Sequence, residues 1–428
     1  MRYPDELIEE IRSRNDIVDV ISKYVELKRN GHTYFGLCPF HNEKAPSFSV
    51  NPAKQMFYCF GCGVGGSVFS FLMKYDKLTF REAVQALAER AGVCLPEEDE
   101  SPQAKKIRYK KKRLLEINEE AAKYFSYQLI SENGKAGLTY LKDRCLSDET
   151  ICRFRLGYAN NLVKHLREKG YSASLMVEAG LASYSEQYGV KDKYWNRAMF
   201  PILDVNSKVI GFGGRVVDDG KPKYLNSPET LVFEKSRHLF GLNFAKHTRT
   251  GYIIICEGYM DVIAMHQAGF TMAVAALGTA FTPQQAQLLK KYTDTLIVSF
   301  DSDSAGTKAA LRCIELAKKA GLTCKVLNLM PYKDPDEFLK NAGKEELQQR
   351  IDDAQNPFFY ELSVAEATYD MSDPAEKTGF HKFIAQKLCE FNEPLERSNY
   401  LEAVAIRYSI NKEALRVLVD RMIAEIEN

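Results

Sequence analysis

The chain has 428 residues, of which 45% are hydrophobic and 27% are charged, a composition typical of a globular protein with roughly two to four domains. Its formal net charge of +1 excludes a globally basic nucleic-acid-binding protein, so any nucleic-acid site must be a local patch. No apolar run approaches the ~20 residues of a membrane-spanning helix, and no apolar signal region opens the chain, so we expect a cytoplasmic protein with no membrane partner.

Four residues with the chemistry of zinc ligands lie in two pairs near the N-terminus. Two residues separate Cys38 from His41, two separate Cys59 from Cys62, and seventeen lie between the pairs. This spacing predicts a tetrahedral site in which four protein ligands close the shell around one Zn²⁺, as in structural zinc sites. The remaining cysteines are scattered, and we expect them to be packing residues in a reducing compartment.

Strand-like segments at 47–50 and 56–58 lie between the two ligand pairs and favour a zinc ribbon over a finger with a helix. His32 is expected at the surface, and Lys44 and Lys54 are plausible contacts to a nucleic-acid backbone. Aromatic residues crowd this module; we expect most of them in its core, while some could stack on bases. They are Tyr34, Phe35, Phe40, Phe48, Phe57, Tyr58 and Phe60.

A change in charge separates this module from the rest of the chain. The acidic residues 97–100 are followed by Ser101-Pro102 and then by seven basic residues between positions 105 and 113. We therefore predict a zinc-ribbon DNA-binding domain at 1–100 and an exposed linker at 101–114 that enters a helix. The basic run is equally compatible with phosphate contacts and with the solvated start of a helix.

From 115 to 245 the pattern predicts a mixed α+β subdomain. Alternating segments at 198–203 and 208–212 are typical of a hairpin. Residues 211–214 resemble part of a dinucleotide-binding fingerprint, but Val216 stands where its last glycine belongs. Spaced basic residues around the hairpin form a local positive patch that could hold template or nucleotide phosphates, although each alone could be plain surface charge. They are Arg197, Arg215, Lys223 and Lys235.

From 246 to 345 apolar strands alternate with helical stretches, which predicts βαβ units and a largely parallel sheet. The expected strands are 252–256, 272–276, 295–300 and 323–329, and the expected helices are 260–268, 282–292 and 304–319. No strand signal follows about residue 356, and we predict a helical subdomain over 346–428.

Acidic residues follow three of these expected strands. Glu257 ends the first and precedes Asp261 by four residues, and Asp301 and Asp303 follow another. Carboxyl ends of parallel strands share one edge of a sheet. A third group comes after the last strand and comprises Asp334, Asp336 and Glu337. Three acidic strand ends at one edge outline a site for Mg²⁺, which prefers carboxylate ligands, water and phosphates.

Simpler explanations of the acids carry less weight. The run from Asp301 resembles the start of an EF-hand loop, but Arg312 occupies its twelfth position, so that calcium site is excluded. The acids could also be helix caps, with Asp301 or Ser304 as the best candidates. One cap would be ordinary, whereas three acidic clusters at successive strand ends favour a metal site.

Together these motifs resemble the bacterial (DnaG-type) DNA primases, over about residues 1–428. The run Cys-Pro-Phe-His…Cys-Phe-Gly-Cys-Gly-x-Gly-Gly at 38–66 is similar to their zinc-ribbon module. Residues 196–235, with Lys-Tyr-Leu-Asn-Ser-Pro from Lys223, are similar to the basic segment of their RNA polymerase domain. Similarity to the Toprim acidic motifs lies at 257–261, 301–303 and 334–336.

The resemblance implies a multidomain fold of α/β and α+β parts: a zinc ribbon, an α+β subdomain, a Toprim-like parallel α/β subdomain and a C-terminal helical bundle. It implies a DNA-directed RNA polymerase, a nucleotidyltransferase that makes short RNA primers for DNA replication on single-stranded DNA from ribonucleoside triphosphates. The core metal ligands and catalytic residues for Mg²⁺ or Mn²⁺ would be Glu257, Asp301 and Asp303, supported by Asp261, Asp334 and Asp336. Template or nucleotide contacts would come from Arg197, Arg215, Lys223, Tyr224, Asn226 and Lys235.

Two other functions are compatible with parts of the pattern. Toprim acids alone also occur in topoisomerases, repair proteins and nucleases, and a zinc-ribbon DNA-binding adaptor with an inactive Toprim fold is a non-enzymatic alternative. Members of the primase family usually continue into a domain that binds the replicative helicase. Because this chain stops at Asn428, where that domain would start, we expect helicase docking to be missing here, and we expect a monomer.

Overall fold

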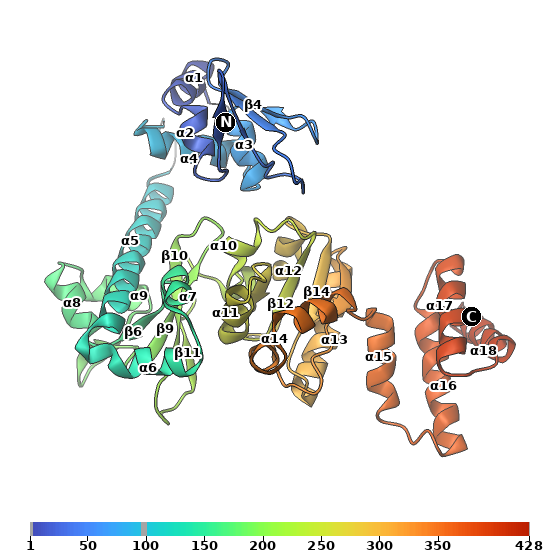
Figure 1. Ribbon diagram of the computed structural model, residues 1–428. Coiled ribbons are helices and arrows are strands. Elements are labelled where there is room, and N and C mark those ends of the chain that lie inside the picture. Colours follow the sequence, from blue (N-terminus) through green and yellow to red (C-terminus); the bar gives the residue numbers. More distant parts are fainter. Residues whose placement is uncertain (1–2, 96–100, 428) are drawn as a thin grey trace. The chain divides into compact units, whose positions relative to one another are not determined.

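A computed structural model describes residues 3–95 and 101–427 of the chain (Figure 1). The acidic run 97–100 lies outside these residues. The chain folds into a large compact unit, made of residues 1–324 and 329–352, and a smaller one made of residues 325–328 and 353–428.

The N-terminal module of the large unit is an antiparallel five-stranded sheet with strands in sequential order and four helices. Three phenylalanine rings from separate elements fill its centre: Phe48 stacks on Phe57, and Phe71 meets Phe57 edge-on. This predicted zinc ribbon is thus confirmed. Its elements are α1 (Asp5–Ser13), α2 (Ile17–Ile21), β1 (Lys28–Asn30), β2 (Thr33–Gly36), β3 (Phe48–Asn51), β4 (Met56–Cys59), β5 (Gly65–Gly66), α3 (Val68–Tyr75) and α4 (Phe80–Ala91).

The long helix α5 (Pro102–Ile130) leads into the α+β subdomain, so the segment predicted as a linker, 101–114, forms the N-cap and first turns of a helix. The antiparallel sheet of this subdomain has the order β11-β10-β9-β6, and β9 and β10 form the predicted hairpin. The elements are η1 (Glu132–Gly134), α6 (Lys135–Asp143), α7 (Asp148–Arg153), β6 (Gly157–Ala159), α8 (Leu162–Glu168), α9 (Ala173–Glu178), β7 (Ala182–Ser185), β8 (Gly189–Asp192), β9 (Arg197–Leu203), β10 (Val209–Val216), β11 (Tyr224–Asn226), η2 (Lys235–Arg237) and α10 (Leu242–Ala245).

The next subdomain is a four-stranded sheet of order β13-β12-β14-β15, in which β12 runs parallel to both β13 and β14. The strands β12, β13 and β14 are almost wholly buried because helices flank the sheet (Figure 1). The predicted alternation of strands and helices is confirmed. The elements are β12 (Tyr252–Cys256), α11 (Tyr259–Gln267), β13 (Ala273–Ala275), α12 (Pro283–Lys290), β14 (Thr295–Ser299), α13 (Ser304–Lys319), β15 (Thr323–Val326) and α14 (Pro335–Asp352).

The smaller unit is helical and has a core of its own, with Phe358, Phe380 and Leu388 among its buried residues. The predicted helical bundle is confirmed, although α14 runs on to Asp352, past the predicted boundary at 346. The helices of this unit are α15 (Pro357–Glu366), α16 (Pro374–Cys389), α17 (Pro394–Arg407) and α18 (Lys412–Glu427).

Candidate metal centres and nucleic-acid interface

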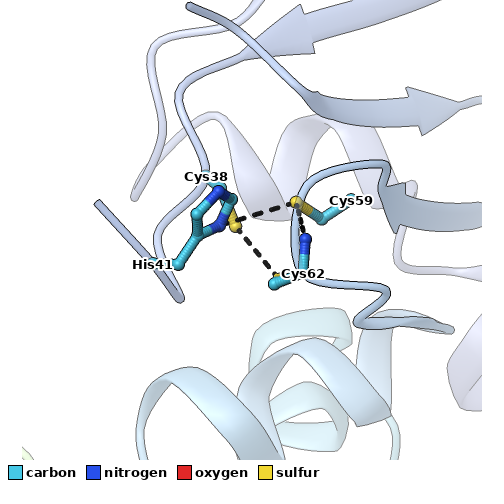
Figure 2. Close-up of side chains that lie close together, drawn as sticks. All are labelled: Cys38, His41, Cys59 and Cys62. Carbon is cyan, nitrogen blue, oxygen red and sulfur yellow. Dashed lines mark hydrogen bonds between the residues drawn. The ribbon is translucent and has the colours of Figure 1, made fainter. Parts of the chain in front are cut away.

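The two predicted ligand pairs meet at one point of the zinc-ribbon module (Figure 2). The sulfur atoms of Cys38 and Cys62 are 3.9 Å apart, and His41 Nδ1 lies 3.7 Å from the sulfur of Cys59. Two sulfurs bound tetrahedrally at about 2.3 Å from zinc would be about 3.8 Å apart, and a sulfur and an imidazole nitrogen about 3.6 Å apart. The ligand atoms therefore already have the spacing of a zinc tetrahedron.

Glu43 contacts several residues of this site. The spacing of the zinc ligands in the sequence did not predict this role. Its carboxylate lies 3.2 Å from His41 Nε2, so it orients the ring with Nδ1 toward the cysteines. It also accepts from the backbone N–H of Cys38 at 2.6 Å and from the hydroxyl of Ser47. Such outer carboxylates set the tautomer and orientation of a histidine ligand.

The second knuckle depends on close packing against the histidine. A Cβ atom at Gly61 would lie 2.6 Å from His41 Nε2, so only glycine fits. The backbone N–H groups of Phe40 and Cys62 point at the sulfurs of Cys38 and Cys59, each at 3.4 Å. Within residues 3–95 and 101–427 this is the only His, Cys, Asp or Glu cluster with metal-ligand spacing.

Of the seven aromatics named for this module from the sequence, Tyr58 and Phe60 are the exposed ones. Phe60 is 69% exposed and Tyr58 47%, and their rings meet edge-on 5.2 Å apart. Most of the other aromatics are in or against the hydrophobic core, as predicted, and His32 is exposed, as predicted. Among the seven aromatics that crowd this module, only the Tyr58–Phe60 pair offers ring faces to a partner.

The acidic residues gather where β12 and β14 end. Glu257 follows β12 directly, Asp301 lies just past the end of β14, and the Asp301 backbone N–H donates to Glu257 Oε1 at 3.0 Å. A Cβ atom at Gly306 would lie 2.8 Å from the same Glu257 oxygen and closer still to the Asp301 carbonyl. The start of α13 can therefore approach these acids only because residue 306 is glycine.

Asp303 is the N-cap of α13, where its Oδ1 accepts from Ala305 and Gly306 at 2.9 and 2.8 Å. The prediction that Asp301 or Ser304 caps this helix is wrong. Asp303 takes that place because its side chain, two residues farther along the loop, reaches the first free N–H groups. Asp301 thereby keeps its carboxylate for other partners.

Burial and mutual repulsion raise the pKa values of three acids at this edge. Burial is the main cause for Asp261, whose pKa rises to about 8, and Asp334 and Asp301 add to it. Burial also raises the pKa of Glu257, with added repulsion from Asp301 and Asp303. The pKa of Asp301 is raised by burial against the opposing effect of Lys333. A bound cation would offset this repulsion.

Basic side chains that the sequence did not single out border the acids. Lys333 Nζ lies 3.5 Å from Asp301. Asp336 is buried and pairs with Lys340 at 2.9 Å and with Arg144, the C-cap of α6, at 3.5 Å. Arg144 belongs to the α+β subdomain, far away in sequence, and nothing local marked it. The acidic edge is thus ringed by positive charge.

The predicted basic patch divides into exposed and internal members. Lys223 is exposed and Tyr224 is 39% exposed, while Arg215 lies over the Tyr224 ring at 5.4 Å. Lys235 is half-buried. The pKa of Lys193 is lowered mainly by burial, and repulsion from Lys235 is the second cause. Lys193 therefore belongs to this patch and was missed.

Arg197 and Asn226 form hydrogen bonds within the protein. Arg197 is only 6% exposed and donates to the carbonyl of Gly214 at 3.2 Å. Asn226 donates to the carbonyl of Leu277 at 3.1 Å and accepts from the hydroxyl of Tyr259 at 2.9 Å, so it joins β11 to the parallel sheet. That both residues contact template or nucleotide stays a prediction.

Gly213 explains the glycine-rich run on β10. A Cβ atom there would lie 2.6 Å from the ring of Tyr259, which is buried and stacks on Phe200 with centroids 5.5 Å apart. The glycines let the α+β sheet pack onto the segment that follows Glu257. They belong to a strand, with no helix after them, which removes the resemblance to a dinucleotide-binding turn.

A zinc ribbon, an α+β sheet and a parallel sheet with acidic strand ends define a class: zinc-ribbon proteins with a Toprim-type core. Three family models match the chain: CHC2 zinc finger at residues 3–103, the N-terminal domain of the DNA primase catalytic core at 124–246, and Toprim-like at 254–339.

Relatives match nearly the whole chain. The DNA primase of Clostridium acetobutylicum is 40% identical over 430 residues, covering 99% of this chain and 71% of that protein. The DNA primase of Listeria monocytogenes is 37% identical, covering 97% and 68%. The chain belongs to the bacterial DNA primase family, and a role in primer synthesis for DNA replication follows from that membership.

Solved structures agree with this assignment. The zinc-binding and RNA polymerase domains of Aquifex aeolicus primase superimpose with a TM-score of 0.61 at 34% identity, covering 97% of this chain and 99% of that one. A DnaG primase catalytic domain bound to single-stranded DNA has a TM-score of 0.61 at 30% identity and covers 70% of this chain and 99% of that one. Among the described helices, none has the length and apolar character needed to span a bilayer.

Proposed function

We propose that the acidic edge of β12 and β14 is the catalytic centre for ribonucleotide transfer, which makes this primase a nucleotidyltransferase. Glu257, Asp301 and Asp303 would hold Mg²⁺ or Mn²⁺ as the core ligands. Asp261, Asp334 and Asp336 would be supporting residues. Of these, Asp336 forms ion pairs with Lys340 and Arg144.

The crowding of carboxylates at one edge of the sheet carries this proposal. Glu257 and Asp301 are joined by a hydrogen bond, and the pKa values of Glu257, Asp301 and Asp261 are all raised. Raised pKa values in a cluster of acids favour a functional role over a purely structural one. A hard cation with carboxylate ligands suits that set.

Bound divalent cations would supply activation of the attacking 3′-hydroxyl and neutralisation of charge on the leaving pyrophosphate. The residues of the chain then have separate tasks. Lys333, 3.5 Å from Asp301, is placed to orient a triphosphate beside the acids. Arg144 and Lys340 hold Asp336 in place.

Template contacts are assigned to the exposed part of the basic patch. Lys223 and Lys235 would contact phosphates, and Tyr224 with Arg215 above it offers a flat surface to a base or ribose. Arg197 and Asn226 would position this surface from inside. In the zinc ribbon, Tyr58 and Phe60 would contact single-stranded template by stacking.

The test is ribonucleotide incorporation on single-stranded DNA with Mg²⁺. Glu257→Gln and Asp301→Asn should each lower synthesis on the order of 100-fold or more, since each removes a metal-binding charge. Asp294→Asn is the matched control because Asp294 precedes β14 at the opposite edge of the sheet, where it is exposed and pairs with Lys290. It should retain wild-type synthesis.

Three results would point elsewhere. Wild-type synthesis by Asp301→Asn would remove the acids from the reaction. DNA binding by the wild-type chain with no incorporation would favour the non-enzymatic adaptor, and relaxation of supercoiled DNA would favour a topoisomerase-like activity.

A further inference from the structure

The first turns of α5 have an exposed surface that primer synthesis at the acidic edge does not explain. The helix begins at a Ser101 cap, whose hydroxyl accepts from Ala104 at 3.2 Å, with Pro102 in its first turn. The first buried residue along α5 is Leu114. The later turns pack on the α+β subdomain, and the earlier ones extend past it (Figure 1).

This exposed part of α5 is strongly basic. Seven of the nine residues from 105 to 113 are lysine or arginine, while the whole chain carries a net charge of only +1. Like charges four apart, such as Lys106 and Lys110, destabilise a helix, and acids interspersed among them would have been the simple remedy for a merely solvated surface. Two of the acids that pair with the run lie outside it: Glu178 is 2.9 Å from Lys110, and Glu116 is 2.8 Å from Arg113.

An exposed aromatic ring lies in the middle of this charge. Tyr109 is 66% exposed, although it sits on a helix that packs elsewhere. Helix geometry places residues three and four positions away on the same face, and for Tyr109 these are Lys105, Lys106, Lys112 and Arg113. We call these five residues the Tyr109 face. Lys111 points about 200° away around the helix from Tyr109.

We propose that the Tyr109 face binds single-stranded template DNA, with its cations on the phosphates and the Tyr109 ring stacked on an unpaired base. That the bound DNA is the template of primer synthesis rests on the proposed function. Cations around an exposed ring suit a polyanion with accessible base faces, which a duplex does not offer. An anionic membrane would instead need an apolar stripe, and Ile107 is the single aliphatic residue between 105 and 113.

The experiment measures binding of the full chain to a fluorescent 20-nucleotide oligothymidylate by anisotropy, without nucleotides or Mg²⁺, over a series of salt concentrations. Lys106→Gln with Lys112→Gln should weaken binding about 5- to 10-fold at 50 mM salt. It should also lower the slope of log K against log salt by about 1.4, which is about 0.7 for each phosphate that is no longer neutralised. Tyr109→Leu should weaken binding about 5-fold or more and leave the slope unchanged, because stacking releases no counterions.

Neighbouring lysines on different faces provide the matched control. Lys111→Gln and Lys112→Gln remove the same charge one residue apart, and glutamine keeps the helix propensity of lysine. Lys112→Gln should weaken binding, and Lys111→Gln should change it less than 2-fold. Circular dichroism of each variant checks that α5 stays helical.

Equal effects of Lys111→Gln and Lys112→Gln, with no effect of Tyr109→Leu, would overturn the proposal in favour of diffuse charge. Tighter binding to phosphatidylglycerol vesicles than to phosphatidylcholine vesicles, abolished in Lys112→Gln while DNA binding stays intact, would overturn it in favour of a membrane. Failure of the proposed function is separable: Asp301→Asn would then retain synthesis, whereas the Tyr109 face is tested by binding alone.

Discussion

The zinc site and the acidic edge are both sets of metal-type ligands, but they are organised in opposite ways. The zinc ligands come from two short loops, and their atoms all lie within 4.8 Å of one another. The acids come from the loops after β12 and β14, from α11 and from the start of α14, and several already have protein partners, such as the Asp303 oxygen that caps α13. One site is closed and locally assembled, and the other is open and depends on the sheet.

That difference separates the structural zinc ion from the cation that we propose for catalysis. Four protein ligands leave no position for substrate at the zinc, so the ion can only stabilise the ribbon. At the acidic edge, burial and then repulsion between the acids raise the pKa values of Asp261, Glu257 and Asp301. A cation held at this open site would keep positions for water and phosphate in its shell.

Removal of a zinc ligand should have the largest effect. Cys59→Ala should lose the zinc entirely, because structural sites of this kind contribute about 10–16 kcal/mol of apparent binding energy to folding. Metal analysis should find less than about 0.1 zinc per chain, and hydrogen exchange should show β3 and β4 deprotected while the parallel sheet stays protected. Cys94→Ala, at an exposed cysteine of the same module, is the control. A full complement of zinc in Cys59→Ala would contradict the four-ligand assignment.

Loss of the outer carboxylate should have an intermediate effect. Glu43→Gln removes the negative charge beside His41 Nε2 and should weaken zinc binding about 10- to 100-fold, the usual range for such partners. Competition with a chromogenic chelator measures it. Glu26→Gln, an exposed carboxylate near Lys28, should leave the affinity unchanged. Equal zinc affinities of the two variants would show that the charge of Glu43 does not contribute to zinc binding.

The smallest effect should come from Asp261. Its pKa is raised to about 8 by burial and neighbouring acids, so the folded core keeps a proton that the unfolded chain releases near pH 4. Stability without Mg²⁺ should therefore fall as the pH rises from about 4 to about 8. Asp261→Asn should remove that fall and stabilise the protein at pH 8 by about 1–3 kcal/mol.

Thermal unfolding of wild type and Asp261→Asn at pH 5 and pH 8 tests this, because the zinc contribution cancels between the two proteins at each pH. Added Mg²⁺ should stabilise the wild type at pH 8 more than the variant. A stability difference that does not change with pH would argue that Asp261 is not protonated in the folded core.

Regular periodicity made much of this protein predictable. The strands of the parallel sheet are apolar and short, so their positions could be predicted to within a few residues, and the Cys and His spacing identified the ribbon. Boundaries were harder: 101–114 is already part of α5, because a basic run with a Ser-Pro start is also a good helix N-terminus. The cap at Asp303 was missed because loop geometry chose among three neighbouring candidates.

By itself the sequence determined which ligands exist and roughly where each element lies, because ligand spacing and hydrophobic period are local properties. Only the tertiary structure decided how distant residues meet: Arg144 with Asp336, Asn226 with Tyr259, and Glu43 behind His41. It also decided that Arg197 is buried while Tyr109 is exposed. Burial and pairing depend on which surfaces pack together, and that packing brings together residues far apart in the chain.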